Sequence, residues 1–150
     1  MSFLSKAVPA FLLLGLAGAS FADSLAECYK AADNRVQVRQ CLQKELDQTR
    51  RDYEEKLAFA QDQAKSLDDA QDQGRRKKRG QGPASQALSA ANRAFDGYLR
   101  RQCDFESAMF GSGTGSGNQL IACRINLMKL RMGALDNLVG ADTRETAVPK

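Results

Sequence analysis

The chain of 150 residues contains no histidine, and aromatic residues make up only 7% of it. The absence of histidine removes the commonest general base, the base of a Ser-His-Asp triad, and the usual partner of cysteine in zinc sites. The shortage of aromatic side chains predicts a thin hydrophobic core. The sequence therefore favours a protein that binds over one that catalyses, and we expect neither enzyme activity nor a cofactor.

Short motifs for phosphate binding and thiol redox chemistry are also missing. The glycine-serine segment Gly111–Gly117 has neither a preceding strand nor the lysine of the G-x-x-x-x-G-K-[ST] pattern. No two cysteines have the C-x-x-C spacing of zinc sites or redox pairs. We interpret the glycine-serine segment as a flexible turn between helices.

Residues 1–22 have the composition of a cleaved signal peptide. Lys6 gives a positive start, residues 7–18 are apolar, and Ser20-Phe21-Ala22 resembles an A-x-A cleavage site. The apolar run is shorter than the roughly 20 residues that span a bilayer. We expect cleavage after Ala22, or alternatively after Ala19, and export to the periplasm or the medium. A buried N-terminal helix or an uncleaved anchor is the alternative, which the small residues ending the run disfavour.

Three long segments have apolar residues at helical spacing, and no segment shows strand-like alternation of useful length. The long segments run from Val36 to about Gln73, from near Ser85 through Met109, and from near Asn118 to about Val139. A short helix is expected before them, over residues 24–32. The predicted fold is all-α, a small antiparallel bundle of three main helices plus a short N-terminal helix.

Helix ends are marked by residues that favour caps. Ser24, Asn34 and Ser85 are candidate N-caps. Gly140 is the expected C-cap of the last helix, and the tail that follows it is expected to be mobile. The predicted organisation is therefore a signal peptide over 1–22, one helical domain over 23–139 and a flexible tail over 140–150.

Each long helix has its own apolar pattern. The first carries one narrow stripe: Leu42, Leu46, Thr49, Tyr53, Leu57, Ala60, Ala64, Leu67 and Gln71. The apolar positions of the second are Leu88, Ala91, Phe95, Tyr98, Leu99, Phe105 and Met109. The third has two adjacent stripes, one of Ile121, Ile125, Met128, Met132, Leu135 and Val139, the other of Leu120, Leu127, Leu130, Ala134 and Leu138. Because it is apolar on two faces, the third helix is expected to lie between the other two.

The chain has four cysteines, Cys28, Cys41, Cys103 and Cys123. An even number of cysteines in a small exported chain indicates disulfides, which help to stabilise a domain with a thin core. Each local pair lies on two helices joined by a short break, so we predict Cys28–Cys41 and Cys103–Cys123. Four cysteines nevertheless allow three connectivities.

A run of five positive charges connects the first and second long helices: Arg75, Arg76, Lys77, Lys78 and Arg79. Such a run repels itself and is expected to be an exposed loop over residues 75–83. It is either a solvated linker or a docking site for an anionic partner such as lipid headgroups, an envelope polymer or an acidic protein. Nucleic acid is disfavoured because no aromatic side chains are interleaved for base stacking. An electrostatic adaptor is thus one hypothesis for the function.

The segment Ala91–Cys103 reads A-N-R-A-F-D-G-Y-L-R-R-Q-C. It resembles the A-Q-R-A-W-x-x-Y-R-D-x-x-C stretch of the lysozyme inhibitor LprI-like family of exported bacterial proteins. The order of the surrounding features is similar too: an N-terminal cysteine pair, a Leu…Tyr…Leu helix, a glycine-rich loop, and a cysteine followed by Arg131 and Leu135. The chain differs at Phe95, where the family has tryptophan, and at Leu99-Arg100, where it has Arg-Asp.

The resemblance covers about residues 25–138 and implies an exported helical domain of the cell envelope that inhibits lysozyme by steric occlusion. We expect Phe95 and Tyr98 to pack in the core rather than to contact a partner. Lysozymes of the common animal type are basic, so inhibition would use acidic positions rather than the basic run. The acidic positions on the first long helix are Glu45, Asp47, Asp52, Glu54, Glu55, Asp62, Asp68, Asp69 and Asp72. The alternative is that these side chains form only a solvated face.

Overall fold

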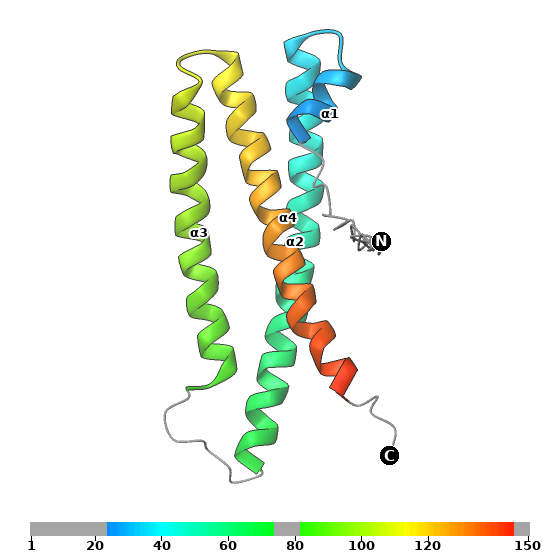
Figure 1. Cartoon of the computed structure of the whole chain (residues 1–150), viewed down its shortest axis with the longest axis vertical. Coiled ribbons are helices and arrows are strands. Elements are labelled where there is room, and N and C mark those ends of the chain that lie inside the picture. Colours follow the sequence, from blue (N-terminus) through cyan, green and yellow to red (C-terminus); the bar gives the residue numbers. More distant parts are fainter. Residues whose placement is uncertain (1–23, 74–81, 146–150) are drawn as a thin grey trace, which may run out of the picture.

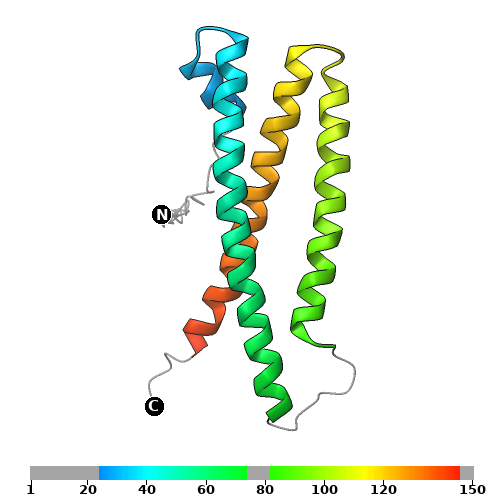
Figure 2. The same cartoon turned by 180° about the vertical axis from the view of Figure 1, so that it is seen from behind.

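The computed structural model describes residues 24–73 and 82–145, which form helices and contain no strand. The helices are α1 (Ser24–Ala31), α2 (Arg35–Gln73), α3 (Ala84–Met109) and α4 (Thr114–Glu145). The three long helices alternate in direction along the chain, and α1 folds back against the start of α2 (Figure 1 and Figure 2). The predicted all-α bundle is confirmed.

The break between α1 and α2 ends in a capped helix start. The Oδ1 atom of Asn34 accepts hydrogen bonds from the backbone N–H groups of Val36, at 3.0 Å, and Gln37, at 3.1 Å. The side chain of Gln37 in turn accepts the N–H of Asp33 at 2.8 Å. The predicted N-cap at Asn34 is therefore confirmed, and free N–H groups of the first turn find partners as helix starts require.

The start of α3 is capped by a side chain of another helix. The residue before α3, Pro83, makes no side-chain cap bond. Instead, the carboxylate of Asp68 on α2 accepts the N–H of Ala84 at 2.6 Å and the N–H of Ser85 at 3.0 Å. The hydroxyl of Ser85 also donates to Asp68, at 2.6 Å. The predicted N-cap at Ser85 is wrong, because Ser85 lies inside the first turn of α3. Its side chain instead bonds to Asp68 and joins α3 to α2.

Replacing Asp68 with alanine is expected to lower the urea midpoint at pH 7. Hydrogen bonds from the Ser85 hydroxyl and N–H hold the pKa of Asp68 below its ordinary value. A carboxylate with a lowered folded pKa stabilises above its unfolded pKa of about 4, and this contribution is lost as the pH falls through the folded value. The difference between wild type and Asp68→Ala should therefore shrink as the pH falls below about 4. Asp69→Ala, a neighbouring exposed position, is the control, and equal midpoints of all three proteins at pH 7 would contradict the cap.

The two ends of α4 differ from the prediction. The helix begins at Thr114, ahead of Asn118, because the turn uses only Gly111 and Gly113, whose φ angles are 72° and 135°. At its other end α4 continues to Glu145, so the predicted C-cap at Gly140 is wrong and residues 140–145 are helical. A glycine costs a helix only about 1 kcal/mol, which need not end it. The predicted signal peptide and residues 146–150 of the predicted tail lie outside the described residues.

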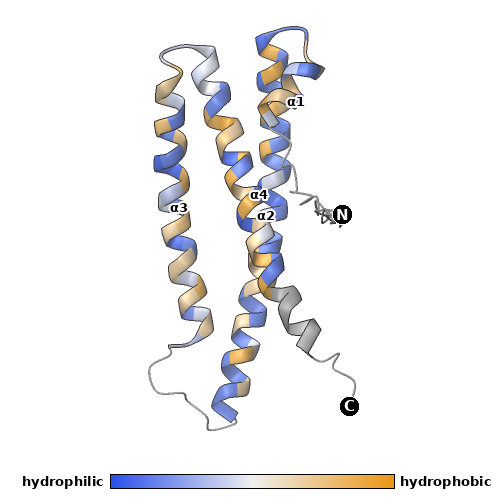
Figure 3. Cartoon of the chain, viewed as in Figure 1, coloured by the Kyte–Doolittle hydropathy of each residue, from blue (hydrophilic) through white to orange (hydrophobic). Residues whose placement is uncertain are grey.

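The core lies mainly between α2 and α4. Hydrophobic residues recur along the helices, interleaved with hydrophilic ones (Figure 3). The buried apolar members of the core on α2 and α4 include Val38, Leu42, Leu46, Tyr53, Ala60, Ile121, Ala122, Ile125, Met128 and Leu135. α4 contacts both α2 and α3, as its two apolar stripes predict. The outer members of its second stripe, Leu130, Ala134 and Leu138, are nevertheless exposed. α3 is the least embedded long helix, since Cys103 is its only buried residue.

Both predicted disulfides are present. Cys28–Cys41 joins α1 to α2, and Cys103–Cys123 joins α3 to α4. Both lie toward the end of the bundle where α2 and α4 begin (Figure 1). Disulfides indicate an oxidising, exported environment.

Candidate functional site

A hollow between α2 and α4 gathers acidic side chains around an exposed aromatic ring. It has a volume of about 690 Å³. Its lining residues are Asp52, Glu55, Lys56, Phe59 and Asp62 from α2, with Met132, Leu135 and Asp136 from α4. We call it the acidic hollow. Asp52, Glu55, Phe59 and Asp62 follow one another at three or four residues, so they share one face of α2 with Lys56 beside them.

The floor of the acidic hollow is apolar. Leu135 is buried, and Met132 is partly buried against the core. The side chain of Phe59, by contrast, is 52% exposed. The exposed ring of Phe59 next to this apolar floor gives a partner an aromatic contact surface within the hollow.

The charge of the acidic hollow is negative. Four carboxylates line it, and Lys56 is the one basic residue in the lining. The Nζ atom of Lys56 donates to Asp136 at 2.5 Å, an ion pair exposed on both sides. Asp52 accepts a hydrogen bond from the Gln48 amide at 2.7 Å. The ion pair satisfies Lys56, so the remaining carboxylates give the hollow a net negative potential that suits a cationic partner.

The structure separates the predicted acidic positions into groups. Asp52, Glu55 and Asp62 come together in the acidic hollow. Glu45 is occupied within the bundle, since it accepts hydrogen bonds from Ser24 at 2.8 Å and from Lys129 at 2.6 Å. Ser24 was predicted to be an N-cap, but its hydroxyl donates to Glu45 and so joins α1 to α2.

The other acidic positions lie outside the hollow. Asp68 caps α3, while Asp47, Glu54, Asp69 and Asp72 lie on exposed parts of α2. Sequence reasoning did not single out Phe59 or Asp136. Phe59 falls outside the apolar stripe of α2, a signal that could have marked it as an exposed ring. Asp136 joins the site only because α4 packs beside α2.

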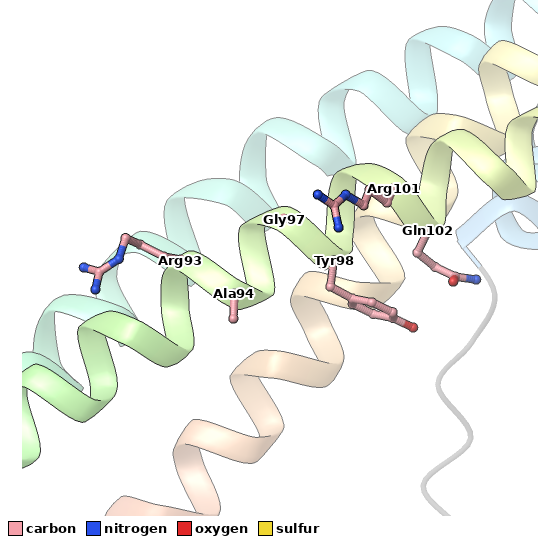
Figure 4. A pocket seen from close by; sticks show the side chains of 6 residues that line it. All are labelled: Arg93, Ala94, Gly97, Tyr98, Arg101 and Gln102. Carbon is pink, nitrogen blue, oxygen red and sulfur yellow. The ribbon is translucent and has the colours of Figure 1, made fainter.

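The segment that carries the family resemblance forms a second hollow on α3. It is lined by Arg93, Ala94, Gly97, Tyr98, Arg101 and Gln102. Figure 4 shows the two arginines on one side of the helix and Tyr98 with Gln102 on the other. All six residues come from one helix, so no second element encloses a ligand there.

Tyr98 does not pack in the core as expected. Its side chain is 53% exposed, whereas Phe95 is partly buried against the core. The physical reason is that α3 lies at the outside of the bundle and buries only a narrow strip of its surface. A residue beside that strip remains in water, whatever its hydrophobicity.

The basic run Arg75 to Arg79 lies outside the described residues. Its flanking residues Gln73 and Gly82 lie at the end of the bundle where α2 ends and α3 begins (Figure 1). Within residues 24–73 and 82–145, no group of acidic or cysteine side chains is placed to hold a metal ion. In the same described part of the chain, no helix has an apolar stretch long enough to cross a membrane.

Comparisons of the chain with protein-family models, with curated proteins and with solved structures found no match.

Proposed function

We propose that the chain is an exported binding protein that holds a basic protein at the acidic hollow, and that a basic lysozyme is its target. The observation that carries the proposal is the exposed ring of Phe59 among the carboxylates of Asp52, Glu55 and Asp62. The resemblance to lysozyme inhibitors supplies the identity of the partner, and the charge of the hollow supports a basic one.

The acidic hollow combines an exposed aromatic ring with surrounding charges, as many protein interfaces do. Exposed aromatic side chains are frequent anchors of binding energy, and carboxylates around them speed the encounter with a cationic partner. The volume of about 690 Å³ lies within the range of roughly 300–1,000 Å³ that is usual for binding pockets. A lysine or arginine side chain of the partner would place its stem on Phe59 and its charge among the carboxylates.

The proposed mechanism is steric occlusion. Long helices cross-linked by disulfides present a surface that loses little conformational entropy on binding. The lining residues include carboxylates, an ion-paired lysine and apolar groups, but no nucleophile paired with a base. The proposal is therefore one of binding and not of catalysis.

The test is lysozyme clearing of a peptidoglycan suspension by c-, g- and i-type enzymes, each with the oxidised protein. We expect stoichiometric inhibition of a basic enzyme. Phe59→Ala is expected to raise the concentration for half inhibition at least tenfold, about the effect of losing an interface anchor. Glu55→Gln should weaken inhibition and its dependence on salt.

The matched control is Glu54→Gln, which removes the same charge from an exposed position of α2 outside the hollow. It should leave inhibition within about twofold of wild type. Equal effects of Glu54→Gln and Glu55→Gln would contradict the acidic hollow as the site. Failure of the wild-type protein to inhibit any of the three enzymes would contradict lysozyme as the target.

The electrostatic adaptor remains the second candidate. It is favoured by the exposed arginines Arg93 and Arg101 on α3, in addition to the basic run Arg75 to Arg79. The two functions respond differently to replacement of the basic run by glutamine. An inhibitor that uses the acidic hollow keeps its activity, whereas an adaptor loses salt-dependent binding to anionic vesicles.

A further inference from the structure

A third hollow, distinct from the acidic hollow and from the hollow on α3, opens between α2, α3 and α4. It has a volume of about 490 Å³. Its walls include Ala60 and Ala64 of α2, Ala87 and Ala91 of α3, and Leu135 and Leu138 of α4. We call it the apolar groove. Apart from Gln63 and Arg131, every residue that lines it is apolar.

The groove exists because two facing helices present alanine where larger side chains would fill the bundle. The small side chains of α2 and α3 leave space between the helices that α4 does not fill. At the groove, Leu67 and Leu138 remain 47% and 69% exposed. Apolar side chains in this position lose contact with water when a ligand covers them, which favours an apolar occupant.

One cationic residue lines the apolar groove. Arg131 lines the groove, and its guanidinium carbon lies 5.7 Å from the centre of the Phe95 ring. Its Nε atom is buried and has no hydrogen-bond partner. Among residues 24–73 and 82–145, Arg131 forms no ion pair with a carboxylate.

The neighbouring phenol of Tyr53 does not neutralise Arg131. The hydroxyl of Tyr53 donates to Asn92 at 2.5 Å, and burial, followed by the negative charge of Asp96, raises the pKa of Tyr53. The positive charge of Arg131 and its hydrogen bond to the Tyr53 hydroxyl oppose this rise, but the phenol stays protonated and uncharged at neutral pH, so the guanidinium keeps its full positive charge. A partly buried guanidinium without a carboxylate partner is suited to an anionic ligand that forms paired hydrogen bonds.

We propose that the apolar groove binds a medium-chain fatty acid, with its carboxylate on Arg131 and its acyl chain along the alanines. The distance along α4 from Arg131 to Leu138 is about 10 Å of helix rise, which suits a short to medium acyl chain. Charge complementarity distinguishes this ligand from a neutral or cationic amphiphile. The proposal does not depend on the identity of the partner at the acidic hollow.

The experiment is calorimetric titration of the oxidised protein with decanoate below its critical micelle concentration. We expect saturable binding of one decanoate per chain. Decanol and decyltrimethylammonium have the same chain without the negative charge, and each should bind at least about tenfold more weakly. Equal binding of decanoate and decyltrimethylammonium would overturn the role of Arg131, and absence of saturable decanoate binding would overturn the site.

Variants that keep the helix intact locate the ligand. Ala91→Leu fills the groove with a strong helix former and should weaken decanoate binding at least about tenfold. Ala94→Leu makes the same change on α3 outside the groove and should bind as wild type. Unchanged binding to Ala91→Leu would overturn the location. If light scattering instead shows a dimer that Ala91→Leu dissociates and decanoate does not bind, a second copy of the chain occupies the groove and the proposal is wrong.

Discussion

Replacing Ile125 with alanine is expected to lower the free energy of unfolding by about 2–5 kcal/mol. The side chain of Ile125 is fully buried on α4, in the same core cluster as Leu42 and Leu46 of α2. Removing its methyl groups leaves a cavity that the long, cross-linked helices close only in part. Urea unfolding followed by circular dichroism measures the loss as a shift of the midpoint at an unchanged slope.

The comparison is Leu130→Ala, a change of similar size on the same helix. The side chain of Leu130 is 49% exposed, so its removal should cost well under half as much. If the two variants lost the same stability, the assignment of the core to the α2–α4 interface would be wrong.

Removing the Cys103–Cys123 disulfide, by changing both residues to alanine, is expected to cost about 3 kcal/mol and to loosen α3 selectively. α3 has no other buried residue than Cys103, and Leu88, Phe95 and Leu99 are only partly buried. The disulfide thus restricts a helix that packing alone holds weakly. Hydrogen exchange should show a larger loss of protection over residues 84–109 than over α2.

The double change of Cys28 and Cys41 to alanine is the matched control, since it removes the other disulfide. It should increase exchange in α1 and leave α3 protected, because Cys28–Cys41 joins α1 to α2 only. Retained protection of α3 without Cys103–Cys123 would show that apolar contacts hold the helix unaided.

Local sequence patterns predicted the helices and the cysteine pairs. The apolar stripe of α2 and the two stripes of α4 follow the helical period, and each disulfide closes between consecutive helices, where alternatives are few. Asn34 was predictable as a cap for the same reason, because it acts on its own helix.

Features that depend on how helices cross were not predictable in this way. The cap of α3 comes from Asp68, which is 17 residues from Ser85 in the chain. The exposure of Tyr98 depends on the outer position of α3, and the acidic hollow depends on the placement of Asp136 beside α2. Helical periodicity predicts on which face of its helix a residue lies, but not which other helix packs against that face.

The two disulfides divide the chain into two separately cross-linked hairpins. One comprises α1 and α2, the other α3 and α4, and no disulfide joins them. The basic run Arg75 to Arg79 lies in the only stretch of backbone between these halves. A trypsin-like cut there would produce a two-chain heterodimer whose association rests on the core between α2 and α4 and on the Asp68 cap. Its stability would then depend on protein concentration, as it does for any non-covalent dimer.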